Sequence, residues 1–109
     1  MTGIEAFGVL EMRVGRIVRA ELNERARKPA YRLWLDFGPE GERRSSAQLV
    51  DLYSVEQLVG RQVIAAMNLG TRNIAGFESE VLVLGLPDAD GRVVLLAPER
   101  AVPPGGRVY

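Results

Sequence analysis

Apolar and polar residues alternate along much of the chain with a period of two, which is typical of half-buried β-strands. Between Met12 and Leu22 the even positions are mainly apolar and the odd positions mainly charged. This pattern predicts one long strand whose even positions face the core. The odd positions from 31 to 37 are apolar and predict a second strand. Gly15 lies within the first strand, where barrels use glycine to bend.

Turn and capping signals divide the rest of the chain. A third strand is expected from Glu42 to about Gln48, after a turn at 38–41. Ser54 and Gln57 fit the capping box of a short helix that ends near Gly60. The remaining expected elements are a helical turn at 4–10, two near-continuous apolar and therefore deeply buried strands at 62–67 and 81–84, and a strand at 93–97 after a turn at 87–91.

This order of elements predicts an all-β protein, a five-stranded Greek-key OB-fold barrel with a short helix between strands 3 and 4. A chain of 109 residues can bury one core, so we expect a single domain over residues 1–109. Its core is expected at about 12–98, with N- and C-terminal extensions at 1–11 and 99–109.

The composition removes whole classes of chemistry. The chain has no Cys and no His, which excludes thiol catalysis, disulfides, imidazole acid–base catalysis and Cys/His zinc sites. Ser45 and Ser46 have no histidine to activate them. Asp88 and Asp90 lack the other oxygen ligands of a calcium loop and are more typical of a hairpin turn. We therefore expect no enzyme, no metal site and no cofactor.

Hydrophobicity and charge are ordinary for a soluble protein. No apolar stretch approaches the ~20 residues that cross a bilayer, so no membrane insertion is expected. The start, Met1 to Glu5, carries an acid instead of the basic region of a secretory signal, which favours a cytoplasmic protein. The net charge is zero, but residues 13–44 hold nine basic and five acidic side chains. This imbalance fits either an anionic partner or a solvated surface of mixed sign.

Two groups of residues near the second strand are candidates for a binding surface. Trp34 lies on the polar face of its strand, where OB barrels bind ligands and where an indole can stack on a base or grip an apolar peptide side chain. The alternative is that a neighbouring segment or a second subunit covers the indole. The second group consists of four cations in and after the first inter-strand loop. They fit either phosphate contacts or an ordinary solvated loop, and they are Arg25, Arg27, Lys28 and Arg32.

Segment 68–80 combines glycines with polar and aromatic side chains and leads into an apolar strand. We expect it to hold a ligand around an exposed Phe77, with Ser79 and Glu80 either binding the ligand or capping the strand entrance. With the third strand, this segment gives the candidate peptide- or RNA-binding residues Trp34, Ser45, Ser46, Gln48, Asn68, Arg72, Ile74, Phe77, Ser79 and Glu80.

Two runs together resemble CsaA, a family of bacterial protein-export chaperones in the tRNA-binding-domain superfamily. They are Ser-Ser-Ala-Gln at 45–48 and Ile-Ala-Gly-Phe-Glu-Ser-Glu-Val-Leu-Val-Leu-Gly at 74–85. Segments 35–38, 58–65, 93–96 and 102–105 are similar to the family as well, so that the resemblance extends from about Ile4 to the C-terminus.

The resemblance implies a non-enzymatic, ATP-independent chaperone that binds unfolded or precursor proteins for export, alongside SecA. It implies that segment 68–80 borders the ligand pocket and that the terminal extensions build a homodimer, with candidate contacts Ile4, Phe7, Val102 and Val108. Kinship with the tRNA-binding domains of methionyl- and phenylalanyl-tRNA synthetases makes a structure-specific tRNA-binding protein the alternative.

Two positions depart from the CsaA pattern. The stretch after Asn68 holds a single cation, Arg72, where the family usually has a proline-rich stretch with two. Position 78 is Glu78, where the family often has a basic residue. Both changes weaken the RNA interpretation more than the peptide one, because phosphate contacts need cations.

Overall fold

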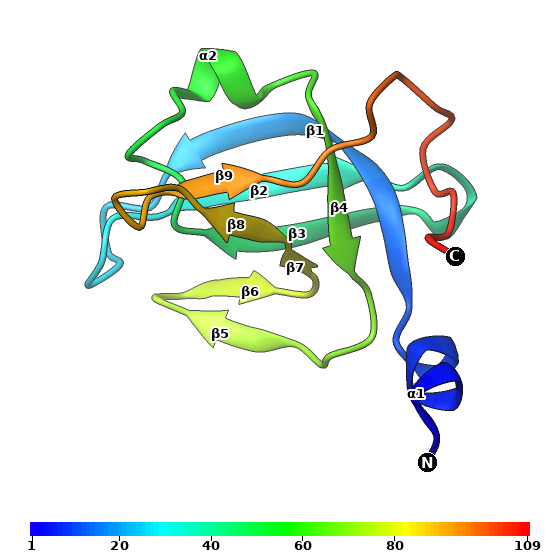
Figure 1. Ribbon diagram of the computed structural model, residues 1–109. Coiled ribbons are helices and arrows are strands. Elements are labelled where there is room, and N and C mark those ends of the chain that lie inside the picture. Colours follow the sequence, from blue (N-terminus) through cyan, green and yellow to red (C-terminus); the bar gives the residue numbers. More distant parts are fainter.

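The computed structural model describes all residues from 1 to 109, and its largest element is an antiparallel five-stranded sheet that curls into a nearly closed barrel (Figure 1). In spatial order the strands are β3 (Glu42–Ala47), β2 (Tyr31–Asp36), β1 (Met12–Leu22), β4 (Gln62–Ala66) and β7 (Leu82–Val83). The mostly β, OB-like fold predicted from the alternation pattern is confirmed.

Short helices and two hairpins complete the fold. The helices are α1 (Gly3–Val9), the 3-10 turn η1 (Gly38–Glu40) and α2 (Val55–Leu58). The hairpins are β5 (Arg72–Ile74) with β6 (Phe77–Ser79) and β8 (Gly85–Pro87) with β9 (Val93–Leu95). Ser54 and Gln57 form the expected capping box at the start of α2. No helix in the structure has the length and apolar character needed to span a membrane.

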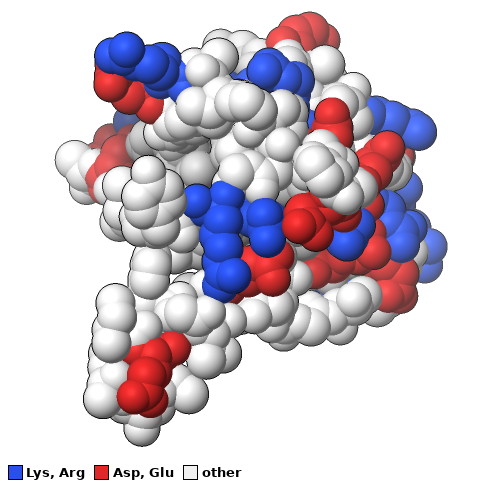
Figure 2. Space-filling model, turned by 90° about the vertical axis from the view of Figure 1, so that its right-hand side faces the viewer, with Lys and Arg blue, Asp and Glu red and all other residues white.

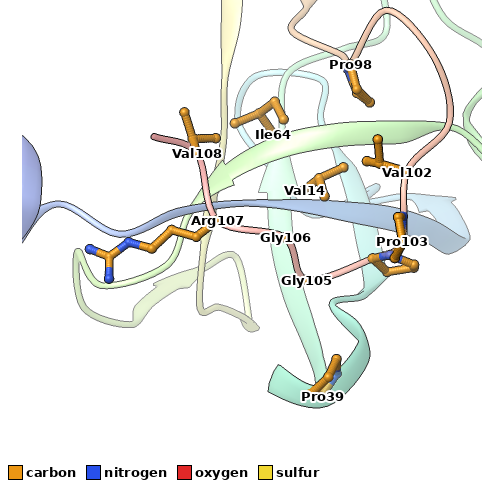
Figure 3. Close-up of a pocket in the computed structure, with 11 residues that line it drawn as sticks. Val14, Pro39, Ile64, Pro98, Val102, Pro103, Gly105, Gly106, Arg107 and Val108 are labelled. Carbon is orange, nitrogen blue, oxygen red and sulfur yellow. The ribbon is translucent and has the colours of Figure 1, made fainter.

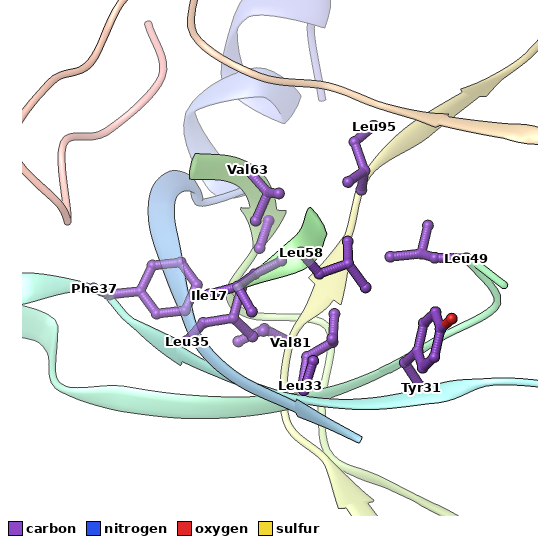
Figure 4. Packing of buried hydrophobic residues seen from close by; sticks show 12 residues of the cluster. Ile17, Tyr31, Leu33, Leu35, Phe37, Leu49, Leu58, Val63, Val81 and Leu95 are labelled. Carbon is purple, nitrogen blue, oxygen red and sulfur yellow. The ribbon is translucent and has the colours of Figure 1, made fainter. Parts of the chain in front are cut away.

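The core lies inside the barrel and is built from inward-facing positions of the strands (Figure 4). Its largest fully buried apolar side chains are Ile17, Leu33, Leu35, Phe37, Leu58 and Val63. Burying each of them stabilises the fold by about 1.5–3 kcal/mol relative to exposure, before conformational entropy is counted. Leu58 belongs to α2, so the capped helix covers one end of the barrel.

The expected alternation in β1 is interrupted at its middle, between Ile17 and Arg19. Ile17 is fully buried, whereas Val18 and Leu22, which were expected to face the core, are half-exposed. The register against β2 explains the change, because Ile17 pairs with Leu35 but Arg19 already pairs with Trp34. Val18 is therefore the additional residue of a bulge, and beyond it the even position Ala20 lies in the core as expected.

Segment 68–84 also differs from expectation. The stretch expected to be a loop contains the β5–β6 hairpin, whose two central residues, Ala75 and Gly76, have φ of 49° and 84°. Positive φ at both positions is the signature of a tight two-residue hairpin turn. The following strand was expected to be deeply buried, but β7 has only two residues and Leu82 is half-exposed.

The C-terminal extension runs antiparallel beside the first residues of β1. The Gly105 N–H donates to the Val14 carbonyl at 2.8 Å, and the Val108 N–H donates to the Met12 carbonyl at 2.8 Å. Arg13 donates to the Gly105 carbonyl and also forms an ion pair with Glu11. The hydrogen bond from Arg13 to the Glu11 carboxylate holds the pKa of that carboxyl below its usual range. The tail is therefore fixed to the barrel by backbone and side-chain contacts.

Candidate functional site

The β5–β6 hairpin covers the outer face of β2 and β3, the face on which OB barrels bind ligands. The Phe77 ring lies edge-on to Trp34, with 5.2 Å between ring centroids and 71° between planes. The Arg19 guanidinium lies 4.3 Å from the centroid of the Trp34 ring. Phe77 is only 6% exposed, so the expectation that it is an exposed contact is wrong. For Trp34 the structure supports the alternative, coverage by a neighbouring segment.

Polar side chains of the hairpin region accept hydrogen bonds from backbone N–H groups at the edge of β3. The Glu80 carboxylate accepts from the Arg44 N–H at 3.0 Å, and the Ser79 hydroxyl accepts from the Ser46 N–H at 3.0 Å. Buried backbone donors need such partners. Ser79 and Glu80 therefore take the capping role that was the alternative to ligand binding.

Two further residues predicted to bind the ligand, Asn68 and Ser45, do not lie on the surface beside the hairpin. The Asn68 side chain accepts from the Glu11 N–H and donates to the Val9 carbonyl, so it holds the segment that follows α1. Ser45 is fully buried opposite Leu33, because alternation along β3 turns it inward, and its expected place at the site is wrong. The Ser45 hydroxyl has no hydrogen-bond partner.

We expect Ser45→Ala to stabilise the protein by about 1 kcal/mol, because a buried hydroxyl without a partner costs free energy. Thermal unfolding should show a rise of roughly 4 °C in Tm for a domain of this size. Ser46→Ala, at the neighbouring half-buried position, is the matched control and should leave Tm nearly unchanged. A fall in Tm for Ser45→Ala would contradict the assignment of an unsatisfied hydroxyl.

A basic cleft of about 670 Å³ opens beside the hairpin. The cations that line it come from the β1–β2 loop and are the exposed side chains of Arg25, Arg27 and Lys28. Its other walls are Ala26, Ala30, Ser46 and Gln48 and the hairpin residues Asn73, Ile74 and Ala75. Arg32, grouped with these cations in the sequence, instead bonds to Glu21 and Asn23 beneath the hairpin. The cleft thus combines positive charge with amide groups and contains no acid.

An uncharged groove of about 440 Å³ lies on the other side of Ser46 and Gln48. It is lined by Ser46, Ala47, Gln48, Leu49, Leu82, Val83, Gly85, Leu86, Pro87, Gly91 and Val93. Sequence reasoning missed Leu82 and Leu86, because the apolar run that begins at Val81 indicated a buried strand. A smaller hollow of about 220 Å³, lined in part by Arg72, Ile74 and Leu82, also borders on Ser46. Ser46 therefore lies where three depressions meet.

The tail groove is a third large depression, of about 520 Å³, and it lies under the C-terminal extension (Figure 3). Its walls are mainly apolar and include Val14, Ile64, Val102 and Val108. Helix α1 contributes no buried residue and projects from the body as a largely uncharged lobe (Figure 2). Ile4 and Phe7 on this helix are 78% and 40% exposed.

These arrangements supply binding groups: cations, amides and apolar surface. No group of three or more Asp, Glu, His or Cys side chains is placed to hold a metal ion.

Residues 12–107 match the family described as a putative tRNA binding domain. Among curated relatives, the methionine–tRNA ligase of Archaeoglobus fulgidus is 36% identical over 96% of this chain and 16% of its own length. That of Methanococcoides burtonii is 37% identical over 94% of this chain and 15% of its own length. The chain thus spans about a sixth of the length of the curated relatives it matches.

Solved structures resemble the chain over its whole length. The chaperone CsaA from Bacillus anthracis superposes with a TM-score of 0.91 at 44% identity, covering 100% of this chain and 99% of that one. CsaA from Picrophilus torridus gives 0.91 at 38% identity, with full coverage of both chains. A methionyl-tRNA-synthetase-related protein from Pyrococcus horikoshii gives 0.87 at 30% identity, with 100% and 98% coverage. The chain belongs to the putative tRNA-binding-domain family, and within it is a protein of the CsaA type.

Proposed function

We propose that this protein is a non-enzymatic, ATP-independent chaperone that binds unfolded or precursor polypeptides. The observation that carries the proposal is the uncharged groove, whose lining holds no ionisable side chain and whose Leu82 and Leu86 are 50% and 58% exposed. An apolar segment of an unfolded chain would gain about 25 cal/mol per Å² of apolar surface buried there. The likeness to CsaA structures over the full chain supports the same function.

The cellular setting is part of this proposal. We place the protein in the cytoplasm, where it would keep precursor proteins competent for export alongside SecA. The resemblance of the runs at 45–48 and 74–85 to the export-chaperone family supports this setting.

The proposed chaperone is a homodimer built from the terminal extensions 1–11 and 99–109. Exposed apolar side chains on α1 favour association, because burying apolar surface away from water lowers the free energy. The tail groove offers a matching apolar surface in which Val102 and Val108 lie, and Ile4 and Phe7 are the complementary candidates on α1.

We expect Phe7→Asp to convert the dimer to a monomer, because the variant would place a charge on the apolar face of α1. Light scattering after size-exclusion chromatography measures the mass directly. The control is Leu69→Asp, which changes a somewhat more exposed apolar residue outside the extensions and should leave the mass unchanged. A Phe7→Asp protein with the wild-type dimer mass would contradict this interface.

The second candidate function is tRNA binding, and the basic cleft favours it. Arg25, Arg27 and Lys28 are exposed and close to the amides of Gln48 and Asn73, which suits phosphates beside a base edge. The family model and the methionine–tRNA ligase relatives support this function.

A competition experiment at physiological salt separates the two functions. A labelled unfolded precursor peptide is bound to the purified protein and then challenged with total tRNA. Peptide binding that resists tRNA would support the chaperone function. Displacement by tRNA would move RNA binding to first place, with a site shared near Ser46. Failure of the peptide to bind would contradict the chaperone function.

A further inference from the structure

We propose that the uncharged groove holds a client polypeptide as an added β-strand between β3 and β8. This inference rests on the proposed chaperone function and specifies the conformation in which the client is bound.

The barrel is open at the end of β3, beside residues 46–49. Near the middle of β3, backbone hydrogen bonds close the barrel. There the Arg44 carbonyl accepts from the N–H groups of Glu80 and Val81 at 2.8 and 3.3 Å. One step further, the Ser79 hydroxyl accepts from the Ser46 N–H. Beyond Ser46, no backbone hydrogen bond joins β3 to β7 or β8. The uncharged groove occupies this opening.

Strand edges face each other across the groove. β3 is the terminal strand of its sheet and pairs only with β2, and β8 pairs only with β9. All three residues of β8 line the groove, whereas Val93 is the only residue of β9 that does so. The edge of β8 that points away from β9 is therefore the one at the groove. An edge strand is a template for pairing with another extended chain.

The lining selects the chemistry of the occupant. The groove is uncharged, and its walls include Leu49, Val93 and the half-exposed Leu82 and Leu86. An extended segment with apolar residues at every second position matches these walls, and a charged segment would bury its charge without a partner. Polyanions are better matched by the basic cleft beyond Ser46, so the groove favours polypeptide over RNA.

The test uses a labelled peptide of about six alternating Val and Thr residues, the length of an ordinary strand. A second peptide of the same sequence carries N-methyl groups on two alternate amides, which removes backbone donors and keeps every side chain. Strand addition predicts about tenfold weaker binding of the methylated peptide. It also predicts that Leu86→Glu weakens binding of the unmodified peptide, while Arg27→Glu, in the basic cleft, does not.

Each alternative outcome is distinct. Equal affinity for both peptides overturns strand addition and leaves the chaperone function standing. Loss of binding in Arg27→Glu but not in Leu86→Glu overturns the location. Absence of binding for any apolar peptide overturns the chaperone function and this inference together.

Discussion

Replacing Gly15 by alanine is expected to destabilise the protein by about 3 kcal/mol, the upper end of the usual cost of overpacking a core. A Cβ atom at this position would lie 2.6 Å from Cε1 of Phe37, closer than real Cβ contacts. The Phe37 ring is fully buried in the core, where close packing opposes its displacement. Thermal unfolding should show a fall of roughly 12 °C in Tm.

Two further variants identify the collision as the cause. Gly8→Ala adds a Cβ in α1 that meets nothing within 4 Å inside the protomer, so its Tm should not fall when the protein is diluted below the range of the proposed dimerisation. Phe37→Leu removes ring atoms that Gly15→Ala would strike, so the double variant should lose less stability than the two single variants added together. All proteins must be compared at one concentration, because the proposed dimerisation would make Tm concentration-dependent. Strictly additive losses would contradict the collision.

Gly15 illustrates which features of the fold are local. The sequence predicts β1 from Met12 to Leu22 and the capping box of Ser54 with Gln57, because alternation and capping depend on neighbouring residues. It also marks Gly15 as special, but as a point of bending. The close approach of Phe37, which comes from the end of β2, is a tertiary contact that alternation does not encode.

The bulge in β1 and the β5–β6 hairpin were beyond prediction for related reasons. The pairing shift between Ile17 and Arg19 is a property of two strands, while the alternation pattern describes one. The hairpin turn holds Ala75 at φ of 49°, a position where Asn or Asp is the usual signal. Because no sequence signal marks this turn, Phe77 is interpreted from the sequence as a loop residue with its ring in solvent.

The candidate site was predictable where charge is clustered in sequence. Arg25, Arg27 and Lys28 line one cleft because they share one short loop. Leu82 and Leu86 were missed because an apolar run usually indicates burial, whereas these strands are short and lie at the opening of the barrel. Apolar residues at such an opening look like core residues until the neighbouring strands are placed.

The double substitution Arg27→Ala with Lys28→Ala is expected to weaken tRNA binding by at least about tenfold, because two charge-assisted phosphate contacts contribute roughly 1 kcal/mol or more each. Both side chains are exposed on the wall of the basic cleft, so the variant should fold with unchanged stability. The slope of log K against log salt should fall in magnitude by about 2, one for each lost contact. Fluorescence anisotropy with labelled tRNA at several salt concentrations measures both quantities.

A matched control removes the same number of positive charges from another part of the surface. Arg61→Ala with Arg100→Ala removes two exposed cations that lie outside the basic cleft and should retain the wild-type salt slope. Binding of an apolar peptide should be unchanged in both double variants, because the lining of the uncharged groove includes none of these residues. Equal loss of tRNA affinity in the two variants would indicate attraction by overall charge alone and would contradict the cleft as the RNA site.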